Sequence, residues 1–378
     1  MEAGDLDHFL CLCHGSTVSG LLLSRLLERF GSFHSLVNSG ADQLAELGLT
    51  TEQVKCIVDV ECDRRSETFA ATCLDWAAAD DQQLVTFDSP AYPRLLREIS
   101  APPPLLFLKG KAEAITSLNL AIVGSRKCTP YGKQNAFWIA AELARAGLSI
   151  CSGLARGIDT EAHRGALQVD GMTVAVLGTG IDICYPRANS TLAQQISCHG
   201  AIVSEFALGQ GPRPHQFPQR NRIISGLSVA TLIVEADEQS GSLITARLAM
   251  EQNREVLAIP GPINSRQSLG CHRFIKQGAA LVSSPEDIMT LLVESGLVPM
   301  GNRPAEKLEK SNPVDPLPPR LQQVLQAIDH AGVIADRLAS ELELPWQELH
   351  GTLLELEVMD RIYRLDGRYY RREDGLHR

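Results

Sequence analysis

This chain of 378 residues lacks the features of exported and membrane proteins. No apolar run reaches about 18 residues, so we expect no membrane-spanning helix. The first ten residues, MEAGDLDHFL, have no basic segment of a signal peptide, and the ten cysteines include no C-x-x-C pair. Cys11, Cys13 and His14 also lack the spacing of a zinc site. We therefore expect a cytoplasmic protein with reduced thiols, no bound metal and no membrane partner.

Signatures of catalysis are missing as well. The sequence has no G-x-S-x-G nucleophile elbow, no P-loop, no H-E-x-x-H pair and no G-x-G-x-x-G dinucleotide fingerprint. Asp159 and His163 are four residues apart and would share a helix face, but no nucleophile accompanies them. We expect no catalytic residues and no cofactor.

The excess of acidic residues lies mainly at the two ends of the chain. The net charge is −10, with 5 basic and 13 acidic residues over 1–80, 15 and 13 over 119–290, and 11 and 15 over 291–378. The middle segment is therefore slightly basic. Because the Debye length is about 8 Å at physiological salt, a basic surface there can bind a polyanion despite the acidic total.

The first 118 residues form a helical segment and an entry to the next domain. Residues 1–80 have apolar residues at helical spacing, interrupted at Gly31, Gly40 and Gly48, which predicts a helical domain of helix-hairpin-helix or SAM-like type. Its acidity favours a packing or interaction role over DNA binding. The prolines at 102–104 exclude a helix there, and LLFLKG at 105–110 predicts a short strand.

Residues 81–298 are expected to form an α/β domain with an extended Rossmann-like, doubly wound sheet. Short apolar segments such as LNLAIVG, LSICSG, TVAVLGTG and VATLIVEA alternate with helical segments such as NAFWIAAELARAG. Such alternation is typical of a parallel sheet covered on both faces. Nearly every predicted strand ends in Gly or Ser, at the edge where ligands bind in these folds.

The C-terminal part of the sequence predicts a linker and a winged helix. Residues 299–317 are charged and rich in proline, which favours a linker. Residues 318–378 contain three short helical segments and then RIYRL and RYYRR, joined at Asp366-Gly367. An Asp-Gly pair between such segments predicts a hairpin. The arginines of this hairpin lie either on a solvated face or against DNA.

Five segments suited to an anion follow the predicted strands of the central domain. They are GSRK, SGLAR, YPRAN, QRNR and QSGS; all five carry basic or amide side chains, and all but QRNR also contain Gly, Ser or Ala. Arginine-rich turns with backbone donors suit a repeating chain of phosphates. Structural alternatives exist, since glycines form tight turns and internal carboxylates such as Glu235 pair with arginines. The candidate DNA-binding residues are Gly124, Ser125, Arg126, Lys127, Gly153, Arg156, Arg187, Arg220, Asn221, Arg222, Ser240 and Gly241.

Taken in order, these motifs resemble the DNA-processing protein A family, also called Smf. The resemblance rests on GSR followed by YG, SGLARGIDTEAHRGAL, AVLGTGIDICYPRAN, FPQRNRIISGLS and VEADEQSGSLITARLA. It implies a protein that binds and protects single-stranded DNA and loads a RecA-type recombinase onto it in natural transformation. It also implies that Arg126 and Arg187 contact DNA. His272 stands where the family usually has asparagine, so no role is transferred to it.

The sequence also suggests an oligomeric state and leaves two alternative functions open. The resemblance implies a homodimer, and Leu248 and Met250 are candidate contacts near the end of the predicted sheet, although core packing is equally consistent with Met250. One alternative function is a nucleotide-processing enzyme of the lonely-guy or lysine-decarboxylase-like fold, whose P-G-G-x-G-T-x-x-E signature is absent. Another is a regulator that binds duplex DNA through the winged helix.

Overall fold

The computed structural model describes residues 3–14, 17–58, 64–298, 318–328, 332–359, 361–365 and 367–371. It has two compact units, Met1–Arg303 and Pro304–Arg378, which we describe separately. The expected linker, residues 299–317, and also Asp366 and Arg372 of the predicted hairpin lie outside the described residues. No helix within the described ranges is long and apolar enough to cross a lipid bilayer.

The first unit begins with a set of short helices. They are α1 (Ala3–His14), α2 (Gly20–Phe30), α3 (Phe33–Val37), α4 (Ala41–Glu46), α5 (Thr51–Val58) and α6 (Arg64–Ala77). Gly31, Gly40 and Gly48 separate them at φ values of 78°, 84° and 81°, a region that favours glycine. The predicted helical segment with glycine breaks is therefore confirmed.

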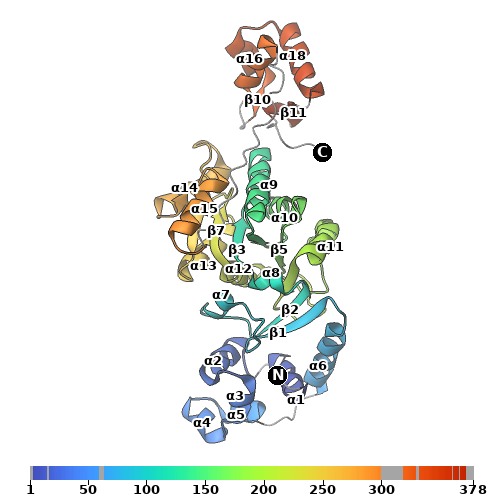
Figure 1. Cartoon of the computed structure of the whole chain (residues 1–378), viewed down its shortest axis with the longest axis vertical. Coiled ribbons are helices and arrows are strands. Elements are labelled where there is room, and N and C mark those ends of the chain that lie inside the picture. Colours follow the sequence, from blue (N-terminus) through green and yellow to red (C-terminus); the bar gives the residue numbers. More distant parts are fainter. Residues whose placement is uncertain are drawn as a thin grey trace. The chain divides into compact units, whose positions relative to one another are not determined.

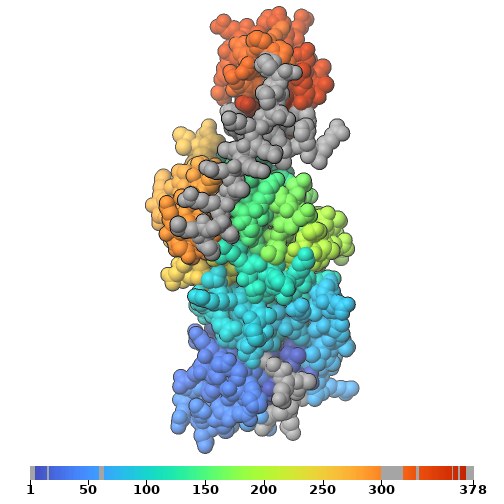
Figure 2. All heavy atoms as spheres, viewed as in Figure 1, coloured from blue at the N-terminus to red at the C-terminus, as the bar shows by residue number. Residues whose placement is uncertain are grey.

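These helices share a core with the sheet that follows. The Ser24 hydroxyl donates a hydrogen bond of 2.6 Å to the Pro102 carbonyl, and the ring of Trp76 packs edge-on against Phe107. Figure 2 shows the blue atoms of the helices directly against the cyan atoms of the next segment. Hydrophobic packing thus continues across residue 80, where the sequence suggested a domain boundary.

The sheet has nine strands in the order β1-β2-β6-β5-β4-β3-β7-β8-β9. All neighbours from β6 to β9 are parallel, whereas β1 and β2 pair antiparallel at one edge. The expected parallel sheet is thus a mixed one, because β2 pairs antiparallel with β6 and β1 pairs antiparallel with β2. The hydrophobic pattern did not reveal β1, whose first residues are polar. The strands are β1 (Gln82–Thr86), β2 (Leu105–Gly110), β3 (Asn119–Val123), β4 (Ser149–Ser152), β5 (Thr173–Val176), β6 (Ala201–Ser204), β7 (Ser228–Ile233), β8 (Glu255–Ala258) and β9 (Ala280–Leu281).

Helices cover both faces of this sheet (Figure 1). Alternate residues of β3 enter different cores: Leu120 and Ile122 pack with α9, α10 and α15, while Ala121 and Val123 belong to the core that contains α11 to α14. The helices are α7 (Arg94–Arg97), α8 (Glu113–Thr116), α9 (Pro130–Arg145), α10 (Ile158–Gln168), α11 (Ser190–His199), α12 (Gln216–Gly226), α13 (Ser242–Glu251), α14 (Leu269–Lys276) and α15 (Pro285–Glu294).

The second unit is a winged helix, as the sequence predicted. Helices α16 (Pro319–Ala327), α17 (Ala335–Leu342) and α18 (Trp346–Val358) precede the hairpin of β11 (Ile362–Leu365) and β12 (Arg368–Arg371), and β10 (Val333–Ile334) pairs with β12. In the hairpin the rings of Tyr363 and Tyr370 stack, whereas Tyr369 is buried in the core. The tyrosines between the hairpin arginines are therefore not all available to a ligand.

Candidate nucleic-acid interface

The candidate site lies where the strand order reverses. The chain passes from β3 through β4 and β5 to β6 on one side, and then through β7 and β8 to β9 on the other. In open parallel sheets, the loops at the carboxyl ends of strands on either side of this point form a ligand crevice. Two adjacent pockets open there, and both are lined by Arg126, Lys127, Ala155, Phe217 and Arg220.

One of them, which we call the basic pocket, is a cavity of about 750 Å³. It collects cations from three loops, since Arg126 and Lys127 follow β3, Arg156 follows β4 and Arg187 follows β5. All four of these side chains are exposed. None of the residues that line the pocket is acidic. Four cations that the sequence analysis singled out in separate motifs thus face one volume.

Two aromatic rings complete the basic pocket. Phe217 lies under the guanidinium of Arg126, with Cζ 5.6 Å from the ring centre, and Tyr185 packs against Phe217 with centroids 5.5 Å apart. Tyr185 is 44% exposed. The sequence analysis missed both residues because nothing in their local pattern distinguishes a surface aromatic from a core one. The sequence signal that could have indicated them is their closeness to candidate arginines, since Tyr185 lies near Arg187 and Phe217 near Arg220.

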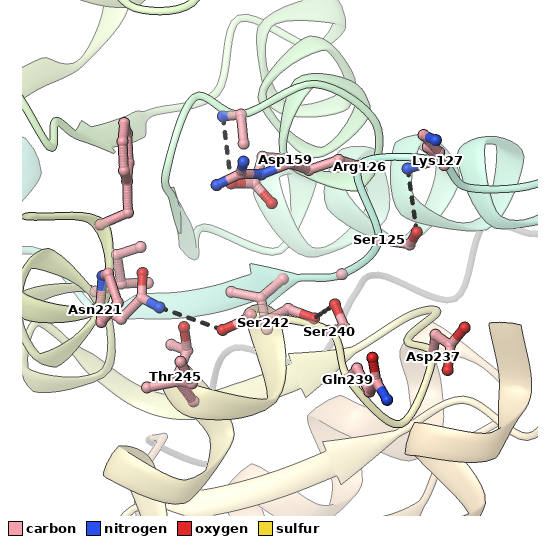
Figure 3. A pocket seen from close by; sticks show the side chains of 18 of the residues that line it. Ser125, Arg126, Lys127, Asp159, Asn221, Asp237, Gln239, Ser240, Ser242 and Thr245 are labelled. Carbon is pink, nitrogen blue, oxygen red and sulfur yellow. Dashed lines mark hydrogen bonds between the residues drawn. The ribbon is translucent and has the colours of Figure 1, made fainter. Parts of the chain in front are cut away.

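The second pocket, which we call the polar pocket, is a cavity of about 710 Å³. Figure 3 shows Arg126 and Lys127 on one side of it and Gln239 and Ser240 on the other. Its lining also includes Asn221, Ser242, Thr245 and Gln267, which offer neutral hydrogen-bonding groups. The loop after β7 is ordered internally, since the Ser240 and Ser242 hydroxyls are 2.7 Å apart and Asn221 Nδ2 donates to the Gly241 carbonyl at 3.4 Å.

Arg220 is buried below both pockets, at 4% exposure. Its Nη1 donates to the carbonyl of Gly153 at 2.7 Å and to that of Val176. A Cβ on Gly153 would lie 2.6 Å from the guanidinium, so this approach requires glycine. Burial lowers the pKa of Arg220 to about 10, while Asp159 opposes the change. Arg220 is thus still protonated at neutral pH and joins the ends of β4 and β5.

Asp159 holds the same loop from the other side. Its Oδ2 accepts hydrogen bonds from the backbone N–H groups of Gly153 at 3.1 Å and Ala155 at 3.3 Å. Burial raises the pKa of this carboxyl, and Arg220 and the two N–H groups counteract the rise. The N–H and carbonyl of Gly153 are therefore both used inside the protein, which leaves neither as a ready donor or acceptor for DNA.

The segment that contains Arg220, Asn221 and Arg222 is helix α12 rather than the turn suggested by the sequence. Pro218 does not prevent this because it lies in the first turn, where its missing N–H has no helical partner. Arg222 forms an ion pair with the buried Glu205. The sequence analysis left open that an internal salt bridge absorbs one of these arginines, and the structure gives Arg222 that partner.

The N-terminus of α9, which follows the GSR turn, does not form an open anion site. Glu235 at the end of β7 accepts hydrogen bonds from the N–H of Thr129 at 2.8 Å and from its hydroxyl at 2.5 Å. This carboxylate occupies the position at the helix terminus that a phosphate would take. Its partner is thus Thr129 and not the arginine considered in the sequence analysis. The exposed cations of the GSR turn are therefore the Arg126 and Lys127 side chains.

Backbone hydrogen bonds join the loop after β3, which carries Arg126, to the start of α10, which follows the loop with Arg156. The Ser125 carbonyl accepts from the Ile158 N–H at 3.2 Å, and the Ser125 N–H donates to the Glu235 carbonyl at 2.7 Å. Gly157 has φ of +82°, and a Cβ there would collide with the Ser125 carbonyl. Gly124 is also packed, since a Cβ would lie 2.6 Å from Ile158. These small residues set the spacing of the exposed cations.

His163 has a structural position on α10, away from the pocket surface. Its Nδ1 donates a 2.7 Å hydrogen bond to the Thr173 hydroxyl, which itself donates to the Ile150 carbonyl at 2.6 Å. Burial lowers the pKa of His163 to about 3, so the ring is neutral.

His272, on α14, donates to the Gly261 carbonyl at 2.9 Å. Within the described ranges, no cluster of three or more His, Cys, Asp or Glu side chains could hold a metal ion.

The fold and the pockets define a class: a Rossmann-like protein with a basic and aromatic pocket at the switch point of its sheet, and with a separate winged helix. Residues 83–293 match the DNA recombination-mediator protein A family, and residues 309–368 match the DprA winged helix domain. The chain belongs to this family of DNA-processing proteins, as the sequence motifs predicted.

Individual relatives agree with this assignment. Protein Smf of Escherichia coli is 40% identical over 88% of both chains, and DNA processing protein DprA of Streptococcus pneumoniae is 46% identical over 52% of this chain and 70% of its own. The S. pneumoniae protein has a solved structure that covers 72% of this chain and 98% of its own, with a TM-score of 0.57 and 34% identity. A structure of Helicobacter pylori DNA processing protein A, concerned with its single-stranded DNA binding mode, covers 56% of this chain and 97% of its own, with a TM-score of 0.52 and 31% identity.

Proposed function

We propose that this chain binds single-stranded DNA in the basic pocket without regard to sequence. The observation that carries the proposal is the convergence of Arg126, Lys127, Arg156 and Arg187 on one volume whose lining has no acidic residue. The H. pylori relative is described as a single-stranded DNA binder, which supports the same ligand. The proposed contact set keeps these four cations, while Arg220 and Arg222 act as positioning residues because their partners are internal.

The two pockets suit different parts of a nucleotide. Cations from three loops suit successive phosphates, and the rings of Phe217 and Tyr185 suit stacking on unpaired bases, which every base allows. The neutral amides and hydroxyls of the polar pocket, including Asn221 and Ser240, suit a sugar or a base edge. A duplex keeps its bases stacked inside, so it cannot use the rings. We therefore expect single strands to bind more tightly than duplex.

Fluorescence anisotropy with labelled single-stranded and duplex oligonucleotides tests this function. Arg126→Ala and Arg187→Ala each remove a charge-assisted contact worth roughly 1.5–3 kcal/mol, so each should weaken binding at least about tenfold without lowering Tm. Arg145→Ala is the matched control, because this exposed arginine lies at the C-terminal end of α9, about 24 Å along the helix from the pocket end. Unchanged affinity in a folded double variant would place the DNA elsewhere.

We further propose that the bound strand is delivered to a RecA-type recombinase, as expected of a recombination mediator. The role requires no catalysis, and the pocket residues act by binding alone. The test is recombinase ATP hydrolysis on single strands already coated with single-strand-binding protein. The chain should shorten the lag, and the Arg126→Ala/Arg187→Ala variant should not. No effect of the wild-type chain on the lag would contradict delivery. Nucleotide hydrolysis by the purified chain alone would favour the enzyme alternative.

We also propose a homodimer through the β8–β9 end of the sheet. Apolar side chains are exposed there, with Met250 at 46%, Ile263 at 89% and Leu281 at 55%, and Leu248 is half-buried. Strand β9 has only two residues and ends the sheet, which leaves an edge to cover. Light scattering on the full chain should give a dimer that Met250→Glu converts to a monomer. A dimer that survives this substitution and Leu281→Glu would place the interface elsewhere.

A further inference from the structure

Helix α18 of the second unit carries a surface that the DNA-binding proposal does not use. In a winged helix this third helix normally enters the major groove, where cations are needed. From Trp346 to Val358, α18 has no Lys or Arg and contains Glu348, Glu355 and Glu357. Its charge has the wrong sign for DNA, so the helix must serve another purpose or none.

A line of mostly apolar side chains runs along the exposed surface of α18. Trp346, His350, Leu354 and Val358 are spaced four residues apart and therefore lie along one side of the helix. Trp346 is 53% exposed, Leu354 56% and Val358 80%. We call these four residues the α18 stripe. The core side of the helix is separate, since Leu349, Leu353 and Leu356 are buried.

The stripe has the shape of a docking surface. The rings of Trp346 and His350 stack, with centroids 6.3 Å apart, and form a flat platform at one end. Gly351 adds no side chain beside the stripe, and no atom lies within 4 Å of where its Cβ would be. The helix is about 20 Å long, and a contiguous exposed apolar surface of this kind is a candidate interaction site. About three turns of a partner helix match this length.

Acidic groups beside the stripe select the charge of the partner. Glu348 pairs with Arg320 at 2.8 Å, but Glu355 and Glu357 have no ion pair among the described residues. A second α18 would bring like charges together, and the phosphates of DNA would be repelled. A partner with cations beside an apolar face would satisfy both features.

We propose that the α18 stripe docks a basic amphipathic helix of another protein. The apolar face of that helix covers Trp346, Leu354 and Val358, and its Lys or Arg side chains meet Glu355 and Glu357. This mode, in which i, i+3, i+4 and i+7 anchors lie on an apolar surface, is common in helix recognition. The C-terminal unit is then a protein-docking module, independent of the single-stranded DNA site.

Peptide binding to the full-length chain tests the proposal. The probes are a fluorescent 18-residue helical peptide with leucine on one face and lysine elsewhere, and the same peptide with glutamate in place of lysine. We expect the lysine peptide to bind at least tenfold more tightly than the glutamate peptide. Leu354→Gln/Val358→Gln should weaken the lysine peptide at least tenfold. The control Ile334→Gln, at an exposed apolar residue of the same unit, should leave it unchanged.

Other outcomes overturn the proposal. Equal binding of both peptides, or binding that Leu354→Gln/Val358→Gln does not weaken, would mean that the stripe does not select a basic helix. If the double variant binds duplex DNA more weakly than the wild type, the stripe is a DNA contact. If the double variant has a smaller mass than the wild type in light scattering, the stripe contacts a second copy of the chain. Thermal melting checks that the double variant is folded. If it is not, Val358→Gln alone replaces it, because Val358 is the most exposed apolar residue of the stripe.

Discussion

A substitution at Arg220 can distinguish a structural residue from a DNA contact. Replacing it by methionine keeps much of its volume but removes a buried charge and the donor that Nη1 supplies to the carbonyls of Gly153 and Val176. Asp159 would then face the gap without its cation. Removing one member of such a buried charged network costs about 3–5 kcal/mol, which corresponds to a fall in Tm of roughly 6 °C or more for a unit of this size.

Thermal melting followed by circular dichroism measures this change. Arg126→Met is the matched control, because the same substitution at an exposed arginine of the pocket should leave Tm within about 1 °C of wild type while weakening DNA binding. Arg220→Lys should fall between the two, since an ammonium keeps the charge but loses the fork geometry. If Arg220→Met melts like the wild type and loses DNA affinity, Arg220 is a contact residue and the structural role is refuted.

Three further substitutions or conditions test the supports of the site. Gly153→Ala should destabilise the chain by about 1–3 kcal/mol, because its Cβ would lie 2.6 Å from the Arg220 guanidinium; an unchanged Tm would contradict this. Thr129→Ala removes the cap that joins α9 to Glu235 and should cost about 1 kcal/mol in urea unfolding, and a neutral result would mean that water replaces the hydroxyl. Burial lowers the pKa of His163 from 6.5 to about 3, so below pH 6.5 the unfolded chain binds the extra proton and stability falls. We expect a loss of about 2 kcal/mol between pH 6.5 and pH 5, and a smaller slope in His163→Gln; equal slopes would show that other groups cause it.

The sequence predicted the sheet and the exposed cations well because both leave local signals. Buried parallel strands are short apolar runs, and β3, β4, β5 and β7 were recognised on that basis. Arg126 and Arg187 follow strands, and parallel strands bring their carboxyl ends to one edge. The polar strand β1 was missed because its pairing with β2 is a tertiary contact that no hydrophobic pattern records.

The roles within the site could not be assigned from spacing alone. In the sequence, Arg220 and Arg222 look like surface arginines beside Asn221. Only the fold shows that Arg220 donates to the Gly153 carbonyl and that Arg222 pairs with Glu205, both of which are distant in the sequence. Glu235 similarly lies 106 residues from Thr129, whose N–H and hydroxyl donate hydrogen bonds to it. For aromatic residues the uncertainty is the opposite one: from the sequence, Phe217 could equally have been a core residue, although it lines the pocket. Burial and pairing of a side chain depend on the whole chain, whereas strand ends depend on a few residues.

The salt dependence of single-strand binding tests the central claim most directly. On single strands each phosphate contact adds about 0.7 to the slope of log Kd against log salt concentration. If Arg126 and Arg187 each hold one phosphate, Arg126→Ala/Arg187→Ala should lower the slope by about 1.4, while Arg145→Ala leaves it unchanged. A double variant with the wild-type slope, or a wild-type chain whose affinity for single strands does not change with salt, would contradict phosphate binding in the basic pocket.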